Sequence, residues 1–206
     1  MPVTAPVIED PAAARRARRN LSTRRALCQA AVRLFAEHGY AATPAGAIAN
    51  AADYAERTFF RHFSRKEDVI FYDLPERLAA LKADFAATEG EPAWTVIRTA
   101  FVANAGRWEA EDPELTLGRV RLFHDEPALE ARYLEICREW EDAVAVIMAA
   151  ELGADPESDL RCRLVAAATV GAFRAAFRAW LAQPGTHIAD HLAEGLDHIE
   201  TGLLPT

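Results

Sequence analysis

The sequence predicts an all-α protein, and three observations lead to that prediction. Apolar residues recur every three to four positions in about nine segments, as they do along one face of a helix. Glycine and proline separate these segments at positions typical of helix ends. No segment shows the strict alternation of apolar and polar residues expected of a strand. With 206 residues, of which 51% are hydrophobic, the chain is long enough to bury a full core.

The first two predicted helices lie before residue 52. The first ends at His38, because glycine follows it, and its apolar face consists of Leu27, Ala30, Ala31, Leu34 and Phe35. The second is short and runs from Pro44 to about Ala51. Thr43 is a favourable N-cap residue and proline is favourable at the first helical position. We therefore expect a helix that begins sharply at Pro44.

A tight turn and two more helices are expected next. Asp53 and Tyr54 form the turn, and a third short helix covers about 55–62. Ser64 is expected to cap a longer fourth helix, whose apolar stripe is Phe71, Leu74, Leu78, Leu81 and Phe85. Pro75 lies inside that stripe, so we expect it to kink the fourth helix.

Five further helices are expected after residue 90. Four of them begin at Glu91-Pro92, Asp112-Pro113, Glu126-Pro127 and Asp155-Pro156, and Pro184-Gly185 precedes the fifth. Their predicted ends lie near Trp108, His124, Leu152, Trp180 and Leu203. This half of the chain therefore predicts a helical bundle.

Charge is distributed unevenly along the chain. Residues 1–70 hold 11 Arg or Lys and 7 Asp or Glu, whereas the remaining residues hold 12 basic and 24 acidic ones. The net charge of −8 therefore hides a basic head on an acidic body. A protein that holds a polyanion at one end is expected to show this pattern.

Several classes of function find no support in the sequence. No apolar run suggests a membrane span, and no signal segment precedes the first helix, so a cytoplasmic location is expected. Cys28, Cys137 and Cys162 are far apart and are expected to be free thiols. No nucleophile motif, phosphate loop or metal-ligand spacing occurs, so we expect no enzyme, no cofactor and no metal. His187 and His191 are spaced to hold a metal, but a solvated or interface face is the favoured interpretation.

The two short helices at 44–51 and 55–62 point to DNA. Neither can bury its own apolar face, so both need the first helix and the start of the fourth as a platform. Two helices joined by a tight turn on such a platform form a helix-turn-helix, whose second helix enters the major groove.

Three pieces of this region strongly resemble the DNA-binding domain of the TetR family of repressors. They are AAVRLFAEHGYAAT, the pair Ile48-Ala49, and RTFFRHFSRKEDV. The resemblance implies a small core of Phe35, Ile48, Phe59 and Phe63. It also implies phosphate contacts from Thr43, Thr58, His62 and Lys66. The residues at or near base edges would be Glu56, Arg57, Phe60 and Arg61.

Elementary chemistry supports several of those implied roles. Thr43 and Lys66 stand at predicted helix N-termini, where free N–H groups favour a phosphate. Arg57 can bind guanine in a bidentate manner, and Phe60 can meet a thymine methyl group. Phe60 is equally compatible with a purely structural position.

Two positions depart from the family pattern. Asp53 stands where glycine is usual at the turn, and aspartate tolerates the left-handed conformation better than most residues. Ala55 replaces the usual serine cap of the recognition helix, which removes a cap worth roughly 1 kcal/mol.

An arginine-rich segment precedes the first helix. Arg15, Arg16, Arg18 and Arg19 are expected to belong to a flexible basic arm over residues 1–20. Such an arm can follow a phosphate backbone or enter a minor groove. The alternative is a basic tail surrounded by solvent. The helix-turn-helix domain would then cover 21–68.

Residues 69–206 are expected to bind a ligand and to form a homodimer, as the resemblance implies. The stretch EPALEARYLEICREWEDAVAVIMAAELG weakly resembles a TetR subgroup that senses acyl-CoA-like ligands. The candidate ligand-binding residues are Trp94, Phe101, Trp108, Arg121, His124, Trp140, Arg174 and Phe177. Ordinary core packing and internal ion pairs remain open for each of them. The last two helices, near 156–181 and 185–203, are expected to form the dimer interface.

The sequence thus predicts a repressor that leaves a palindromic operator when a small apolar or amphipathic effector binds. The alternative is a DNA-binding regulator with a filled core, which is controlled by a partner or bound constitutively. A cavity in the C-terminal bundle would discriminate between the two.

Overall fold

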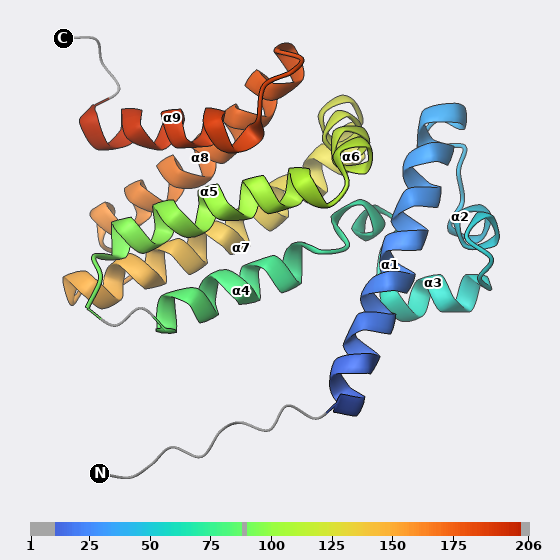
Figure 1. Ribbon diagram of the computed structural model, residues 1–206, viewed down its shortest axis with the longest axis horizontal. Helices are drawn as coiled ribbons and strands as arrows, with labels where there is room; N and C mark the ends of the chain where they lie inside the picture. Colours follow the sequence, from blue (N-terminus) through green and yellow to red (C-terminus); the bar gives the residue numbers. More distant parts are fainter. Residues whose placement is uncertain (1–10, 88–89, 203–206) are drawn as a thin grey trace. The chain divides into compact units, whose positions relative to one another are not determined.

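The computed structural model describes residues 11–87 and 90–202 of the chain. Every regular element in these ranges is a helix, so the predicted all-α class is confirmed (Figure 1). The chain divides into two compact units, one ending at Asp73 and the other beginning at Leu74. This division falls five residues after the boundary expected between 68 and 69. The predicted tail over residues 1–10 lies outside the described ranges.

The first unit contains the predicted helix-turn-helix. Its elements are α1 (Pro11–His38), α2 (Ala45–Ala51), α3 (Glu56–His62) and a 3₁₀ helix, η1 (Glu67–Phe71). Helix α1 packs against α2, α3 and η1, and so forms the platform that the two short helices need. The core side chains are almost fully buried, and they include Leu27, Phe35, Ile48, Phe59 and Phe63. All four core residues implied by the family resemblance are therefore confirmed.

Helix α1 begins earlier than the sequence suggested. We expected the arginine-rich segment to be part of a flexible arm, but Arg15 to Arg19 are helical and belong to α1. Alanine at 12–14 and 17 has the highest helix propensity, which favours continuation of the helix toward the N-terminus. Residues 11–20, which the expected arm included, are therefore helical.

The predicted fourth helix is split into two. It consists of η1 and then α4 (Leu74–Ala87), so the apolar stripe from Phe71 to Phe85 does not belong to one continuous helix. Pro75 consequently lies in the first turn of α4, where its missing N–H has no intrahelical acceptor to lose. The predicted kink at Pro75 is wrong.

The second unit is a bundle made by α4 and five later helices. These are α5 (Ala93–Glu111), α6 (Pro113–Asp125), α7 (Pro127–Leu152), α8 (Leu160–Ala182) and α9 (Ile188–Thr201). Asp112 and Glu126 accept backbone N–H bonds at the starts of α6 and α7, and Gly153 ends α7 in the left-handed conformation. Helix α8 begins at Leu160, capped by Asp159, rather than near 156 as predicted. Helix α7 packs on α8, and α8 packs on α9.

Helix α8 is unusual in composition. Within the described ranges it alone has the length and mean hydropathy that would allow a helix to cross a bilayer. That test is weak, because long apolar helices of soluble bundles also pass it. Leu160 and Leu164 are largely exposed on α8, whereas Cys162 and Ala166 are buried. One apolar face of α8 therefore lies on the surface of the single chain.

Candidate DNA-binding and ligand-binding sites

The turn between α2 and α3 sets the angle of the recognition helix. Asp53 has φ of 60°, the left-handed conformation that the sequence predicted for this position. The N–H of Tyr54 then donates to the carbonyl of Ala49 at 2.9 Å, which closes the end of α2. A Cβ on Gly46 would lie 3.3 Å from the carboxyl group of Glu56, so glycine leaves room for that side chain against α2. The sequence analysis missed the role of Gly46.

Helix α3 has one buried face and one exposed face. Thr58 and Phe59 are buried, whereas Arg57, Phe60 and Arg61 are exposed. The exposed three are spaced i, i+3 and i+4, so they share one face of the helix. Phe60 is 54% exposed although it is a large aromatic residue, which is costly unless another surface covers it. Two cations and an aromatic ring on one exposed helical face suit a major groove.

Ala55 precedes α3 with an extended backbone and makes no side-chain cap. The predicted loss of the serine cap is therefore confirmed.

Thr43 differs from its expected position, whereas Lys66 is at a helix N-terminus as expected, since it is the N-cap of η1. The N-cap of α2 is Pro44 rather than Thr43. Thr43 is 2% exposed, and its hydroxyl donates to the carbonyl of Gly39 at 2.8 Å. Lys66 donates from Nζ to the carbonyls of Tyr40 and Thr43 at 2.8 and 3.2 Å, and Nζ lies 3.8 Å from the centre of the Tyr40 ring. Both side chains therefore stabilise the loop that follows α1.

His62 is half-buried at the end of α3. Burial lowers the pKa of its imidazole, and the positive charges of Arg61 and Arg24 lower it further. The ring is therefore neutral at pH 7 and offers a phosphate one N–H donor rather than a cation.

The second unit contains a small apolar cavity between α5, α7 and α8. Its free volume is about 20 Å³. This volume holds one or two water molecules and is too small for an effector. The residues around it are Leu74, Phe101, Asn104, Trp108, Tyr133, Ile136, Cys137, Trp140, Val170 and Phe173. Phe101 packs edge-on against both Trp140 and Phe173, at 5.4 and 6.0 Å between ring centres. Burial raises the pKa of the Cys137 thiol to about 11 and that of Tyr133 well above its usual range.

Polar groups at this cavity are few. The indole N–H of Trp108 is buried without a hydrogen-bond partner, and the guanidinium of Arg119 lies 4.8 Å from the Trp108 ring centre. Asn104 is 8% exposed, and its Oδ1 accepts a hydrogen bond from Arg77 at 3.1 Å. Trp108 thus contributes its ring to the cavity wall and carries a buried N–H that no described residue satisfies.

The predicted ligand-binding residues divide into three groups. Phe101, Trp108 and Trp140 line the cavity together. Phe177 packs behind Trp108 at 5.0 Å between ring centres. The residues that the structure does not place around the cavity are Trp94, Arg121, His124 and Arg174.

Arg121 is exposed, so it does not fit a buried pocket. His124 is half-buried with an unpaired Nε2, and burial lowers the pKa of its ring.

None of the non-aromatic cavity residues was a sequence-based ligand candidate: they are Leu74, Asn104, Ile136, Cys137 and Val170. Asn104 follows Phe101 by three positions and precedes Trp108 by four, and that spacing on one face was the available signal.

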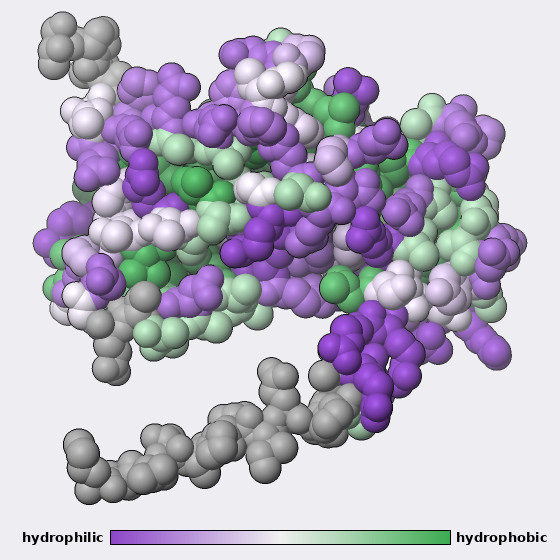
Figure 2. All heavy atoms as spheres, in the orientation of Figure 1, coloured by the Kyte–Doolittle hydropathy of each residue, from purple (hydrophilic) through white to green (hydrophobic). Residues whose placement is uncertain are grey.

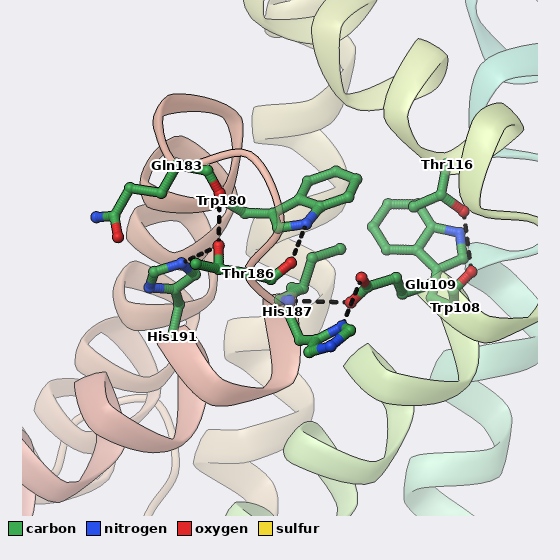
Figure 3. Close-up of polar contacts among 9 residues, drawn as sticks. Trp108, Glu109, Thr116, Trp180, Gln183, Thr186, His187 and His191 are labelled. Carbon is green, nitrogen blue, oxygen red and sulfur yellow. Dashed lines mark hydrogen bonds and ion pairs between the residues drawn. The ribbon is translucent and has the colours of Figure 1, made fainter.

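The three histidines at and within α9 make separate contacts, and Figure 3 shows those of His187 and His191. His187 pairs with the carboxylate of Glu109 on α5 at 3.0 Å, and the N–H of Ile188 donates to the other oxygen of that carboxylate. His191 instead contacts the Thr186 hydroxyl at 2.8 Å. His187 and His191 therefore each have a partner other than a metal, and the Glu109 carboxylate ties the start of α9 to α5. His198 lies 3.9 Å from Glu194.

Solved structures establish the fold independently. A crystal structure of Thermus thermophilus FadR, a TetR-family transcriptional repressor in complex with lauroyl-CoA, is 25% identical with a TM-score of 0.59. The match covers 89% of this chain and 96% of that one. A putative TetR-family regulator from Syntrophomonas wolfei has a TM-score of 0.65 at 13% identity, covering 90% and 98% of the two chains.

Sequence comparisons give the same result along most of the chain. TcmR, an HTH-type transcriptional regulator of Streptomyces glaucescens, is 34% identical over 84% of this chain and 79% of its own length. The putative mycofactocin biosynthesis regulator MftR of Mycobacterium tuberculosis is 26% identical over 90% of this chain and 93% of its own. Residues 27–72 match the bacterial regulatory proteins of the tetR family, and residues 91–204 match the MftR C-terminal domain. The chain therefore belongs to the TetR family of DNA-binding transcriptional regulators.

Proposed function

We propose that this regulator is a cytoplasmic homodimeric repressor that leaves a palindromic operator when a small apolar or amphipathic effector enters the second unit. The observation that carries the proposal is that one chain has both an exposed face on α3 suited to DNA bases and an apolar cavity in its second unit. Arg57, Phe60 and Arg61 form that face. Arg57 and Arg61 can bind guanine edges, and Phe60 can cover a thymine methyl group.

The cavity favours an effector that is mostly apolar. Aromatic rings surround it, and the Trp108 indole N–H supplies one unsatisfied donor. Entry of a ligand requires these rings to move apart, because the free space is small. The complex of FadR with lauroyl-CoA supports an acyl chain as the first effector to test.

The dimer would form through α8 and α9. Leu160 and Leu164 are 76% and 63% exposed on α8, and a Cβ at Gly171 would meet no atom within 4 Å. One face of α8 contains positions 160, 164, 167, 171 and 175. The last three are alanine, glycine and alanine, which permit close approach of a partner helix. A two-fold dimer places the two α3 helices on successive turns of the duplex, so the operator is expected to be a palindrome.

A second candidate function is a regulator with a filled core. The observation that favours it is the 20 Å³ of free space, which holds no effector without rearrangement. Such a regulator would bind operator constitutively or respond to a protein partner.

One experiment separates the two functions. Operators are selected from a random duplex library with the wild-type protein, and lauroyl-CoA, laurate and coenzyme A are then titrated separately. We expect lauroyl-CoA or laurate to release the operator and to change the tryptophan fluorescence. Val170→Leu, which adds one methylene group at the cavity wall, should retain operator binding and weaken this response, whereas Val146→Leu on an exposed position of α7 should keep both.

Operator binding that no acyl compound alters would favour the filled-core regulator. Failure to enrich any duplex would contradict DNA binding itself.

A further inference from the structure

We propose that the first turns of α1 form a second DNA-binding surface, which contacts phosphates beside the base pairs that α3 reads. The surface consists of Arg15, Arg16, Arg18 and Arg19, which Figure 2 shows as a strongly hydrophilic patch at one end of α1. The inference rests on the proposed function, because it assumes that α3 holds a duplex.

The charge on this surface is not balanced within α1. Residues 11–36 contain seven arginines and neither aspartate nor glutamate, and Glu37 is the first acid of the helix. Residues 15–20 are all exposed, and the four arginines make no ion pair with any described residue. No acidic residue in the described part of the chain neutralises these four guanidinium groups.

Without DNA, these arginines repel one another along the start of α1. Arg15 and Arg19 are spaced i, i+4, while Arg15 and Arg18, and Arg16 and Arg19, are spaced i, i+3, so like charges are neighbours. Like charges at these spacings destabilise a helix. The positive end of the helix dipole adds to this repulsion. None of the residues 15–26 is fully buried, so tertiary packing contributes little to this part of α1.

Phosphates of a DNA backbone would relieve this charge repulsion. They neutralise the arginines, and their negative charge also complements the positive end of the helix. The five residues from Arg15 to Arg19 span about 7.5 Å of helix. Duplex DNA carries about one negative charge per 1.7 Å of its axis, so several phosphates lie within reach of the four side chains.

The position of the surface in the fold identifies the partner. The same helix continues into the core at Leu27 and Phe35 and packs against α2 and α3. Within this unit the start of α1 extends beyond α3 (Figure 1). A duplex held by α3 is therefore the polyanion nearest to the arginines. Since helix α1 is continuous, the surface is fixed to the reading head instead of being tethered by a loose arm.

The test compares full-length proteins on one 40-base-pair duplex of mixed sequence. The four arginines are replaced together by glutamine, which keeps helix propensity and removes charge. The logarithm of DNA affinity should fall more steeply with the logarithm of salt concentration for wild type than for this variant. The difference in slope should be about one unit for each phosphate that an arginine neutralises in a protomer. Replacing the same four by lysine should restore the slope. Arg107→Gln with Arg138→Gln, on exposed positions of the second unit, should leave it unchanged.

Hydrogen exchange gives an independent readout. Backbone amides of residues 12–20 should exchange more slowly in wild type when the duplex is added. The inference is overturned if the glutamine variant keeps the wild-type salt slope. It is also overturned if the duplex slows the exchange of these amides equally in wild type and in the glutamine variant. If wild type binds no duplex, the proposed function fails with it.

Discussion

Arg77 on α4 donates a hydrogen bond from Nη1 to Oδ1 of Asn104, 3.1 Å away on the wall of the apolar cavity. The same guanidinium donates from Nη2 to Glu111 at 2.8 Å, so Arg77 joins the cavity wall to the end of α5. Its side chain is only 11% exposed. A ligand that claims the Asn104 amide therefore competes with the bond that holds α4 to α5.

Arg77→Met should uncouple effector binding from operator release. The substitution keeps the apolar stem and removes both hydrogen bonds, so we expect a folded protein destabilised by about 1–3 kcal/mol. The ratio of operator affinities with and without lauroyl-CoA should move toward one. Titration of the selected operator in both conditions measures that ratio. Arg98→Met removes the exposed ion pair with Asp197 and should leave the ratio unchanged; equal ratios in all three proteins would exclude Arg77 as the link.

Lys66→Ala should lower the stability of the first unit even in the absence of DNA. The ammonium group donates to two loop carbonyls, and loss of hydrogen bonds from a charged group costs about 1.5–3 kcal/mol. Denaturant unfolding monitored by circular dichroism should show this loss. Lys82→Ala on an exposed position of α4 is the control and should change stability little. An unchanged unfolding midpoint with weakened DNA binding would instead favour the phosphate contact that the family resemblance implies.

Arg57→Ala should relax the choice of base at one operator position. The side chain is exposed on α3, and a bidentate contact to guanine is worth about 1–3 kcal/mol of discrimination. Selection from a random duplex library by the variant should therefore yield one degenerate position in each half-site. An equal loss of affinity for operator and random DNA would mean that Arg57 contacts phosphate.

Local signals were sufficient for most of the helices and for the core of the first unit. The left-handed turn at Asp53 and the uncapped start of α3 at Ala55 were predicted correctly, because each depends on the residue itself and its neighbours. The break between η1 and α4 was missed, since Phe71 and Leu74 continue one helical stripe across it.

Tertiary contacts account for the errors at the candidate sites. Lys66 bonds to a loop that lies 23 to 26 residues earlier, and Asn104 pairs with an arginine 27 residues away. No periodic pattern encodes such pairs, so neither the internal role of Lys66 nor the hydrogen bond between Arg77 and Asn104 was predictable from the sequence.

The pairing of His187 with Glu109 should make stability depend on pH. The hydrogen bond and charge of Glu109 raise the pKa of His187 above its usual 6.5. A raised pKa in the folded state means that protonated His187 stabilises the protein below about pH 6.5, and that this contribution is lost as the pH rises through the folded pKa. Thermal unfolding of wild type and His187→Gln should therefore differ at pH 5.5 and converge at pH 8.5. His198→Gln, near Glu194 on the same helix, controls for loss of a histidine; a pH-independent difference for His187→Gln would contradict the pairing.

Leu164→Asp should convert the proposed dimer to a monomer. Leu164 is 63% exposed in the single chain, and a charge there would be buried without a partner if α8 packs against α8 of a second copy. Sedimentation at micromolar concentration should show a dimer for wild type and a monomer for the variant. Ala103→Asp, on an exposed position of α5, should stay dimeric. Because the palindrome needs two reading heads, the monomer should also lose most of its operator affinity while keeping the wild-type helix content. A dimeric Leu164→Asp protein would place the interface on another surface.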